Sequence, residues 1–163
     1  MGMVMFWKSV DATTGEALLE MDPEDFFDWL DSESAGVSFD LDKAWHAVHF
    51  TLTGTAWGTE TAVGKAVLGG EEFAEDMGYG PPRWLSPAEV AETATALEGL
   101  SVDQFTGMLD FESMAVNDIY PNIWGGDSEA DDLVDFVVTG FRQLRDRFIQ
   151  VAAAGDGFVI SLQ

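Results

Sequence analysis

Both histidines of the chain lie three residues apart in the stretch Leu41-Asp-Lys-Ala-Trp-His-Ala-Val-His-Phe-Thr-Leu-Thr-Gly54. In a helix, Asp42, His46 and His49 occupy positions i, i+4 and i+7, which fall on about one face. Such a set could hold zinc or iron, or one imidazole could act as a general base. A buried imidazole can equally hydrogen-bond a carbonyl or a carboxylate and serve only the core. Local spacing gives no complete ligand set, so we predict no metal, no cofactor and no catalytic residue.

Other catalytic signatures are missing from the sequence. There is no cysteine, which excludes thiol catalysis, disulfides and cysteine-ligated metal sites. One stretch resembles a phosphate loop, but it has five residues between its glycines, and Ala66 stands where a hydroxyl is needed: Gly58-Thr-Glu-Thr-Ala-Val-Gly64-Lys65. With thirty acidic residues, pairs of carboxylates are inevitable and indicate no glycosidase chemistry.

Charge is the most unusual bulk property of the chain. Thirty acidic and seven basic residues give a net charge of −23, and twelve carboxylates lie between Arg83 and Arg142 without a basic residue. This charge disfavours binding to nucleic acid and to anionic membranes, because it repels phosphate groups. A basic protein partner is permitted, although acidity can also serve solubility alone. The first seven residues are apolar, too few for a secretory or membrane segment, so we expect a cytoplasmic protein. The oligomeric state is not predicted.

The apolar pattern predicts a mostly helical chain. Leu41, Trp45, Val48 and Leu52 form one apolar stripe of a helix that begins at Asp40 and ends at Gly54, and the stripe with both histidines faces a polar cavity or the surface. The longest helix has an almost continuous core stripe, made by Leu133, Val137, Phe141, Leu144, Phe148 and Val151. Capping boxes at Ser86 and Ser101 begin two more helices. Shorter helices are predicted over 13–21, after Asp22-Pro23, and over 59–68.

Two apolar runs at opposite ends of the sequence have the composition of strands. They are Met3 to Trp7 and Phe158-Val-Ile-Ser-Leu162, and we expect them to pair. Between them we find no internal repeat and no low-complexity linker. At 163 residues and 47% hydrophobic, the chain is long enough for one well-buried core. The predicted fold is therefore one α+β domain over residues 1–163, mostly helical, with a small sheet formed by the N- and C-terminal strands.

A lone cation and several aromatic residues suggest a pocket. Arg83 is isolated in acidic sequence beside Trp84, in a Gly-Pro-rich segment where it could meet an anionic ligand, or where it could stack on an aromatic ring or pair with a carboxylate. Tyr79, Tyr120 and Trp124 could line the same pocket, or they could fill the core.

Three phrases of this sequence resemble the YfbM-like family, small bacterial proteins classed as a domain of unknown function. They are Asp42-Lys-Ala-Trp-His-Ala-Val-His-Phe-Thr-Leu-Thr-Gly54, Gly78-Tyr-Gly-Pro-Pro-Arg-Trp-Leu-Ser-Pro87 and Asp118-Ile-Tyr-Pro121. The likeness covers essentially the whole chain. It implies one α+β domain and no established activity, and it supplies no catalytic residues. Since His46, His49, Arg83, Asp118 and Tyr120 lie in these phrases, we hypothesise that the phrases meet around one cleft.

Two classes of function remain. The first is a non-enzymatic binding protein, of inhibitor or immunity type, that presents its carboxylates to a basic protein. The second is a small-ligand sensor or a metal-assisted enzyme that uses a His46/His49 cleft. We favour the first class because no catalytic constellation is complete.

Overall fold

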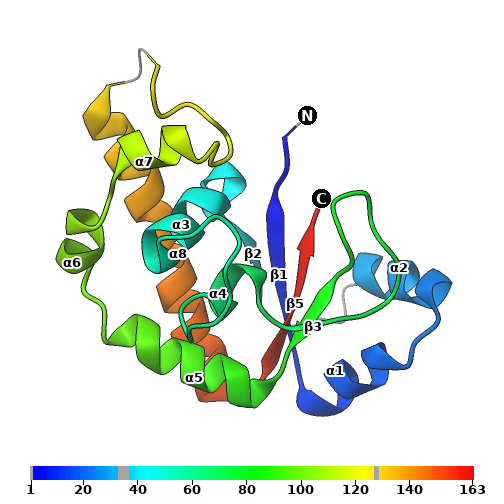
Figure 1. Ribbon diagram of the computed structural model, residues 1–163. Coiled ribbons are helices and arrows are strands. Elements are labelled where there is room, and N and C mark those ends of the chain that lie inside the picture. Colours follow the sequence, from blue (N-terminus) through cyan, green and yellow to red (C-terminus); the bar gives the residue numbers. More distant parts are fainter. Residues whose placement is uncertain (1, 33–36, 127–128) are drawn as a thin grey trace.

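The first and last strands pair at the centre of a five-stranded antiparallel sheet (Figure 1). The computed structural model describes residues 2–32, 37–126 and 129–163. The strand order is β2-β1-β5-β4-β3. The strands are β1 (Met5–Val10), β2 (Ser38–Asp40), β3 (Glu71–Glu72), β4 (Arg83–Leu85) and β5 (Gly157–Leu162). The predicted pairing of the two terminal strands is confirmed, and their register places Trp7 opposite Ile160.

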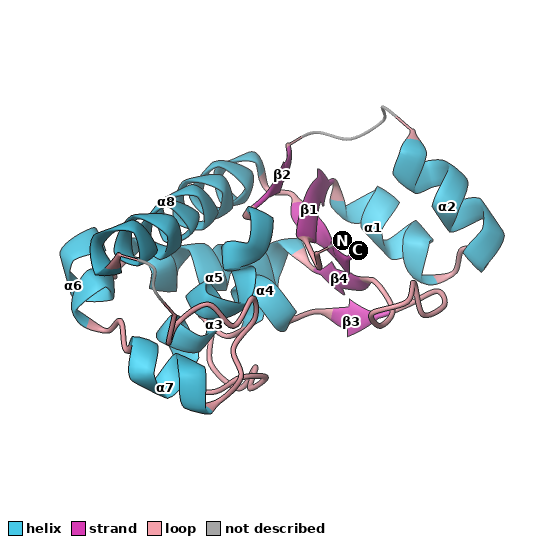
Figure 2. Cartoon of the chain, turned by 90° about the horizontal axis from the view of Figure 1, so that it is seen from above, coloured by secondary structure: helices cyan, strands magenta, loops and turns pink. Residues whose placement is uncertain are grey.

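Helices cover both faces of this sheet (Figure 2). They are α1 (Ala12–Leu19), α2 (Pro23–Asp31), the 3-10 helix η1 (Asp42–Ala44), α3 (Trp45–Thr53), α4 (Lys65–Leu68), α5 (Pro87–Glu98), α6 (Val102–Gly107), α7 (Phe111–Val116) and α8 (Ala130–Ala154). The main core lies between the sheet and the α3, α4, α5 and α8 side. A smaller core, with Leu18, Phe26 and Trp84, lies under α1 and α2. The fold is a mostly helical α+β domain, as predicted.

The longest helix packs as its apolar stripe predicts. Each predicted stripe residue of α8, from Leu133 to Val151, is buried. Gly140 lies where α8 contacts η1 and α3, and a Cβ atom there would come within 3.2 Å of Ala44 and Val48 side-chain atoms. This close approach fixes α8 beside η1 and the start of α3.

Local capping signals predict some helix boundaries well and others poorly. Ser86 and Ser101 both form complete capping boxes, so α5 and α6 begin where expected. The helix expected to begin at Asp40 instead begins at Trp45, since residues 38–40 form β2 and the Asp40 carboxylate accepts a hydrogen bond from the backbone N–H of Asp42. Gly54 ends α3 in the left-handed conformation, as expected.

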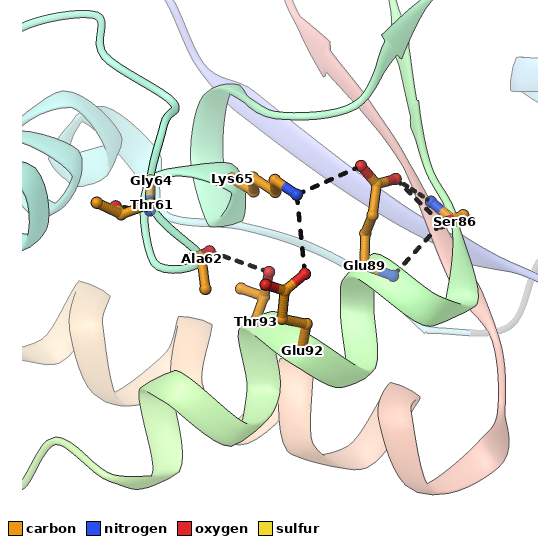
Figure 3. A network of polar contacts seen from close by, with 8 residues as sticks. All are labelled: Thr61, Ala62, Gly64, Lys65, Ser86, Glu89, Glu92 and Thr93. Atoms are coloured by element: carbon orange, nitrogen blue, oxygen red, sulfur yellow. Dashed lines mark hydrogen bonds and ion pairs between the residues drawn. The ribbon is translucent and has the colours of Figure 1, made fainter.

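The helix expected over 59–68 is much shorter in the structure. Only Lys65–Leu68 are helical, because threonine side chains hold the preceding loop, as in the bond from the Gly64 N–H to the Thr61 hydroxyl. The loop is tied to α5 by a hydrogen bond from the Thr93 hydroxyl to the Ala62 carbonyl, and the Lys65 ammonium group lies 3.8 Å from both Glu89 and Glu92 (Figure 3). Among the residues described, no helix combines the length and apolar character needed to cross a membrane.

Candidate functional site

Helix α3 carries both histidines into the interior. The relative exposure of the His46 side chain is 2% and that of His49 is 0%. The helix is buried nearly all round because most of its other residues are alanine, aromatic or aliphatic. The sequence predicted a polar cavity or the surface for this stripe. Neither histidine lies on the open surface, and the two rings have different surroundings.

His46 uses both ring nitrogens in hydrogen bonds to backbone groups. Its Nδ1 accepts from the N–H of Tyr120 at 3.0 Å, and its Nε2–H donates to the carbonyl of Ala56 at 2.9 Å. These partners assign a neutral ring with its proton on Nε2. Burial lowers the pKa of His46, and the bond to Ala56 opposes this shift. Metal binding or base catalysis at His46 would therefore require one of these bonds to break.

Aromatic rings enclose His46. The ring stacks on Trp45 with centroids 4.8 Å apart, and Trp57 covers it from the solvent side at 4.5 Å. Trp45 also lies 5.9 Å from Tyr120. The chain near the start of β1 completes this group, because the Met3 N–H donates to the Tyr120 hydroxyl and the Met3 carbonyl accepts from the Trp45 indole. His46 thus joins three separate segments of the chain.

His49 has no such partners. Neither of its ring nitrogens makes a hydrogen bond within the described residues, although both atoms are buried. Burial lowers the pKa of His49 to about 4, with further lowering from His46 and Arg83, while the nearby backbone of Gly58 opposes the shift. At neutral pH the ring is therefore uncharged.

Arg83 enters the same interior layer from β4. Its Nη2–H donates to the Val67 carbonyl at 3.2 Å and lies 3.8 Å from the Met5 sulfur, but its buried Nε has no hydrogen-bond partner. Burial lowers the pKa of Arg83, and the negative charge of Glu72 partly offsets this effect. Within the described part of the chain, the ion pairs found are those of Lys65, so no carboxylate pairs with Arg83.

The remaining predicted site residues lie in other surroundings. The Trp124 indole donates to the Ile119 carbonyl at 2.6 Å, and its ring stacks on Phe111. Asp118 is exposed with a left-handed backbone and accepts from Asn122. Tyr79 is 54% exposed in the β3–β4 loop, whose residue Met77 packs on the smaller core. The structure thus brings His46 to Tyr120 and His49 near Arg83.

Asp42 lies away from both histidines' ring nitrogens, in a hollow of about 500 Å³ beside α8. The hollow is lined by Asp40, Leu41, Asp42, Asp132, Asp135, Phe136, Thr139, Gly140 and Gln143. None of its four aspartates forms an ion pair with a described residue. We call these lining residues the acidic pocket. The α8 contribution was missed, although Asp132, Asp135, Thr139 and Gln143 recur at helical spacing on the face opposite the core stripe.

A metal centre has no complete ligand set in the residues that the structure describes. No group of three or more histidine, aspartate or glutamate side chains there is arranged to hold an ion. Asp42, which the sequence placed on the histidine face, is exposed and lies in the acidic pocket instead. The arrangement offers two chemical environments, a negatively charged hollow on the surface and a buried pair of hydrogen-bond donors.

The fold and the three sequence phrases around residues 42–54, 78–87 and 118–121 indicate a class of protein without an assigned activity. The chain belongs to the family described as Domain of unknown function (DUF1877), whose model matches residues 1–161, and the predicted resemblance is confirmed. It is similar to Protein YfbM of Escherichia coli (strain K12), with 27% identity over 128 residues, which cover 76% of this chain and 75% of that protein.

A solved structure has the same architecture. It is described as the crystal structure of a protein of unknown function, YfbM from Escherichia coli, and it matches with a TM-score of 0.78. The match covers 98% of this chain and 99% of the other, at 21% sequence identity. At this identity the likeness shows the fold alone.

Proposed function

We propose that this chain is a non-enzymatic binding protein whose acidic pocket receives a lysine or arginine side chain of a basic partner protein. The observation that carries the proposal is a concave site of about 500 Å³ in which four aspartates have no cationic partner among the described residues. Carboxylates that converge on a hollow attract a cationic group more strongly than scattered surface charges do.

The lining of the acidic pocket suits a long basic side chain. Leu41 and Phe136 offer apolar contact to the methylene stem, while the carboxylates of Asp132 and Asp135 accept hydrogen bonds from the charged end. The net charge of −23 adds long-range attraction, which raises the association rate of a basic protein at low salt. The partner is therefore recognised by charge and by the shape of one hollow.

His46 favours this function over catalysis at the predicted cleft. Both of its nitrogens are occupied by the backbone, so it lacks a free atom for a metal or a proton transfer. His49 is enclosed, with 0% exposure, so a partner protein cannot reach it without a change in the covering loop. The acidic pocket, in contrast, is open to a partner and offers four carboxylates.

Two triple variants of equal charge test the proposal. The first, Asp42→Asn, Asp132→Asn and Asp135→Asn, neutralises the acidic pocket; asparagine also tolerates the left-handed backbone of residue 42. The control, Glu16→Gln, Glu20→Gln and Asp28→Asn, removes exposed carboxylates on the α1 and α2 side of the sheet. Each variant has a net charge of −20, from −23 with three carboxylates removed.

Binding of a hexa-arginine peptide is measured by calorimetry at low and at physiological salt. We expect the pocket variant to bind about tenfold more weakly than the parent protein, since three charged contacts of about 0.5 kcal/mol each are lost. The control variant should stay within about threefold, by the same estimate for charges that make no contact. Equal weakening in both variants would show that general charge, and not the acidic pocket, binds the peptide.

A further inference from the structure

Three buried polar atoms without partners gather in one layer of the fold. They are Nδ1 and Nε2 of His49 and Nε of Arg83. Nearly all buried polar groups in folded proteins make hydrogen bonds, so each exception calls for a specific explanation, such as a bound ion or a functional role. His49 is fully enclosed, which makes it an interior group and not a partly solvated one.

Arg83 adds an uncompensated positive charge to this layer. The chain contains thirty acidic residues, yet no described carboxylate comes within ion-pair distance of the Arg83 guanidinium. Glu72 lies directly opposite Arg83 in the β3–β4 register, but Glu72 is exposed and acts on it only at a distance. Arg83 is partly buried, and a cation in such surroundings is stabilised when an anion balances it.

The positions of His49 and Arg83 are fixed by neighbouring elements on the same side of the sheet. Arg83 bonds the carbonyl of Val67 in α4, and α4 packs against α3, which carries His49. The two groups are close enough for the charge of Arg83 to disfavour protonation of His49. Both therefore lie between the sheet and the α3–α4 pair, with the backbone of Gly58 beside the His49 ring.

The loop over 54–64 covers this interior and has few bonds to the rest of the protein. Several of its hydrogen bonds are internal and involve threonine side chains, as from the Gly58 N–H to Thr55. Among the described residues, side-chain bonds tie it to other elements at three points: between Thr53 of α3 and Thr55, from His46 to Ala56, and from Thr93 to Ala62. Opening this loop offers a route to His49 that leaves the core helices in place.

We propose that Arg83 and His49 form an interior binding site for a small carboxylate of the size of formate or acetate. One carboxylate oxygen accepts from the Nε–H of Arg83, and the other accepts from the N–H of the His49 ring. The ligand thereby supplies the missing acceptor for both groups and the missing negative charge. This site shares no residue with the acidic pocket, so it stands or falls independently of the proposed function.

Salt gives the interior site a distinctive signature. The net charge of −23 repels an approaching anion, and dissolved salt screens this repulsion. Carboxylate binding should therefore strengthen as an inert salt is added, whereas hexa-arginine binding to the acidic pocket should weaken. Binding should also raise the pKa of His49, because the new negative charge opposes the effect of Arg83; the neutral His46 ring and the exposed Glu72 are the other titratable groups near this layer.

The test is a titration of the parent protein with sodium formate and sodium acetate, followed by the side-chain ¹⁵N signals of both histidines. We expect a saturable shift at His49, with His46 as the internal control because its nitrogens are already bonded. Arg83→Lys should weaken binding about 10- to 100-fold, since it keeps the charge and removes the Nε donor. Arg145→Lys, which alters another buried and unpartnered Nε, should stay within about twofold if that Nε is unrelated to the site.

Two results would overturn the proposal. One is a His49 signal that shifts linearly, or not at all, with both carboxylates in the parent protein, a measurement that does not depend on any variant folding. The other is saturation by sodium chloride alone with no displacement by formate, which would assign the layer to a halide. Saturation by formate that Arg83→Lys leaves unchanged would also contradict the assigned role of Arg83.

Discussion

The surroundings of His46 and of His49 differ sharply, although three positions of one helix separate the two residues. Around His46, two backbone groups from other segments occupy both nitrogens, and the rings of Trp45 and Trp57 pack against the imidazole. Around His49, no described protein group bonds either nitrogen, and the positive charge of Arg83 disfavours protonation of the ring. The comparison shows that a His-x-x-His spacing assigns no role by itself. Tertiary contacts give His46 a hydrogen-bond partner at each ring nitrogen and leave both nitrogens of His49 without one among the described residues.

The largest expected effect on stability comes from replacing His46. His46→Leu should lower the free energy of unfolding by about 2 to 4 kcal/mol, because it leaves the Tyr120 N–H and the Ala56 carbonyl without partners and disturbs the stacked rings. Urea denaturation at pH 7.5 measures this. A loss below about 1 kcal/mol would mean that solvent replaces both bonds easily, and the contrast between the two histidines would lose its basis.

His49 should contribute to the pH dependence of stability. Its pKa is about 4 in the folded protein and about 6.5 when unfolded, so the unfolded state binds the proton more readily. Stability is therefore lost as pH falls from about 6.5 to 4, by about 3 kcal/mol in total from this group. Urea denaturation of the parent protein and of His49→Leu is measured across this pH range. The difference between their free energies of unfolding isolates the contribution of His49, because both proteins share the same carboxylates. Parallel curves would contradict the assignment.

At neutral pH the same substitution should matter little. His49→Leu is expected to change the free energy of unfolding by less than about 1 kcal/mol at pH 7.5, because a neutral ring without hydrogen bonds is replaced by an apolar side chain of similar size. Thermal and urea unfolding measure the change. A loss as large as that of His46→Leu would indicate that His49 has a structural partner after all.

The smallest effect is expected at the cover of His46. Trp57 is 63% exposed, so Trp57→Ala should lower the free energy of unfolding by only about 0.5 to 1 kcal/mol through lost ring contact. The His46 side-chain signals should move in an NMR spectrum while those of His49 stay in place. Val116→Ala, at a residue that is 78% exposed, serves as the control.

Apart from the pairing of β1 with β5, the parts of the fold that were predicted from sequence are those encoded locally. Ser86 and Ser101 capped their helices as expected, and the α8 stripe is buried throughout, because side chain and partner lie within a few residues. Strands β2, β3 and β4 were missed. They are two or three residues long and exist through pairing with neighbours in the sheet, for which a single strand carries no pattern. α7 did carry a local signal, since the Asp110 carboxylate accepts from the Ser113 N–H.

The site was harder to predict for the same physical reason. The bond between His46 and the backbone of Tyr120 joins residues 74 positions apart, and backbone groups leave no trace in composition. The helix wheel grouped Asp42 with the histidines, and this grouping is wrong because α3 begins only at Trp45. Asp42 lies in η1 with a positive φ, and it lines the acidic pocket instead. The sequence singled out Arg83 as an isolated cation. In the structure it forms no ion pair with a described residue.

The pairing of β1 with β5 also constrains how the protein can be made. Reciprocal backbone bonds between Val4 and Gln163 continue this pairing beyond the strands. Since β5 is the central partner of both β1 and β4, a ribosome must release residues 157–162 before the sheet can close. During synthesis the apolar faces of the helices therefore stay exposed until β5 has emerged. Such a state is prone to aggregation and is one that chaperones bind.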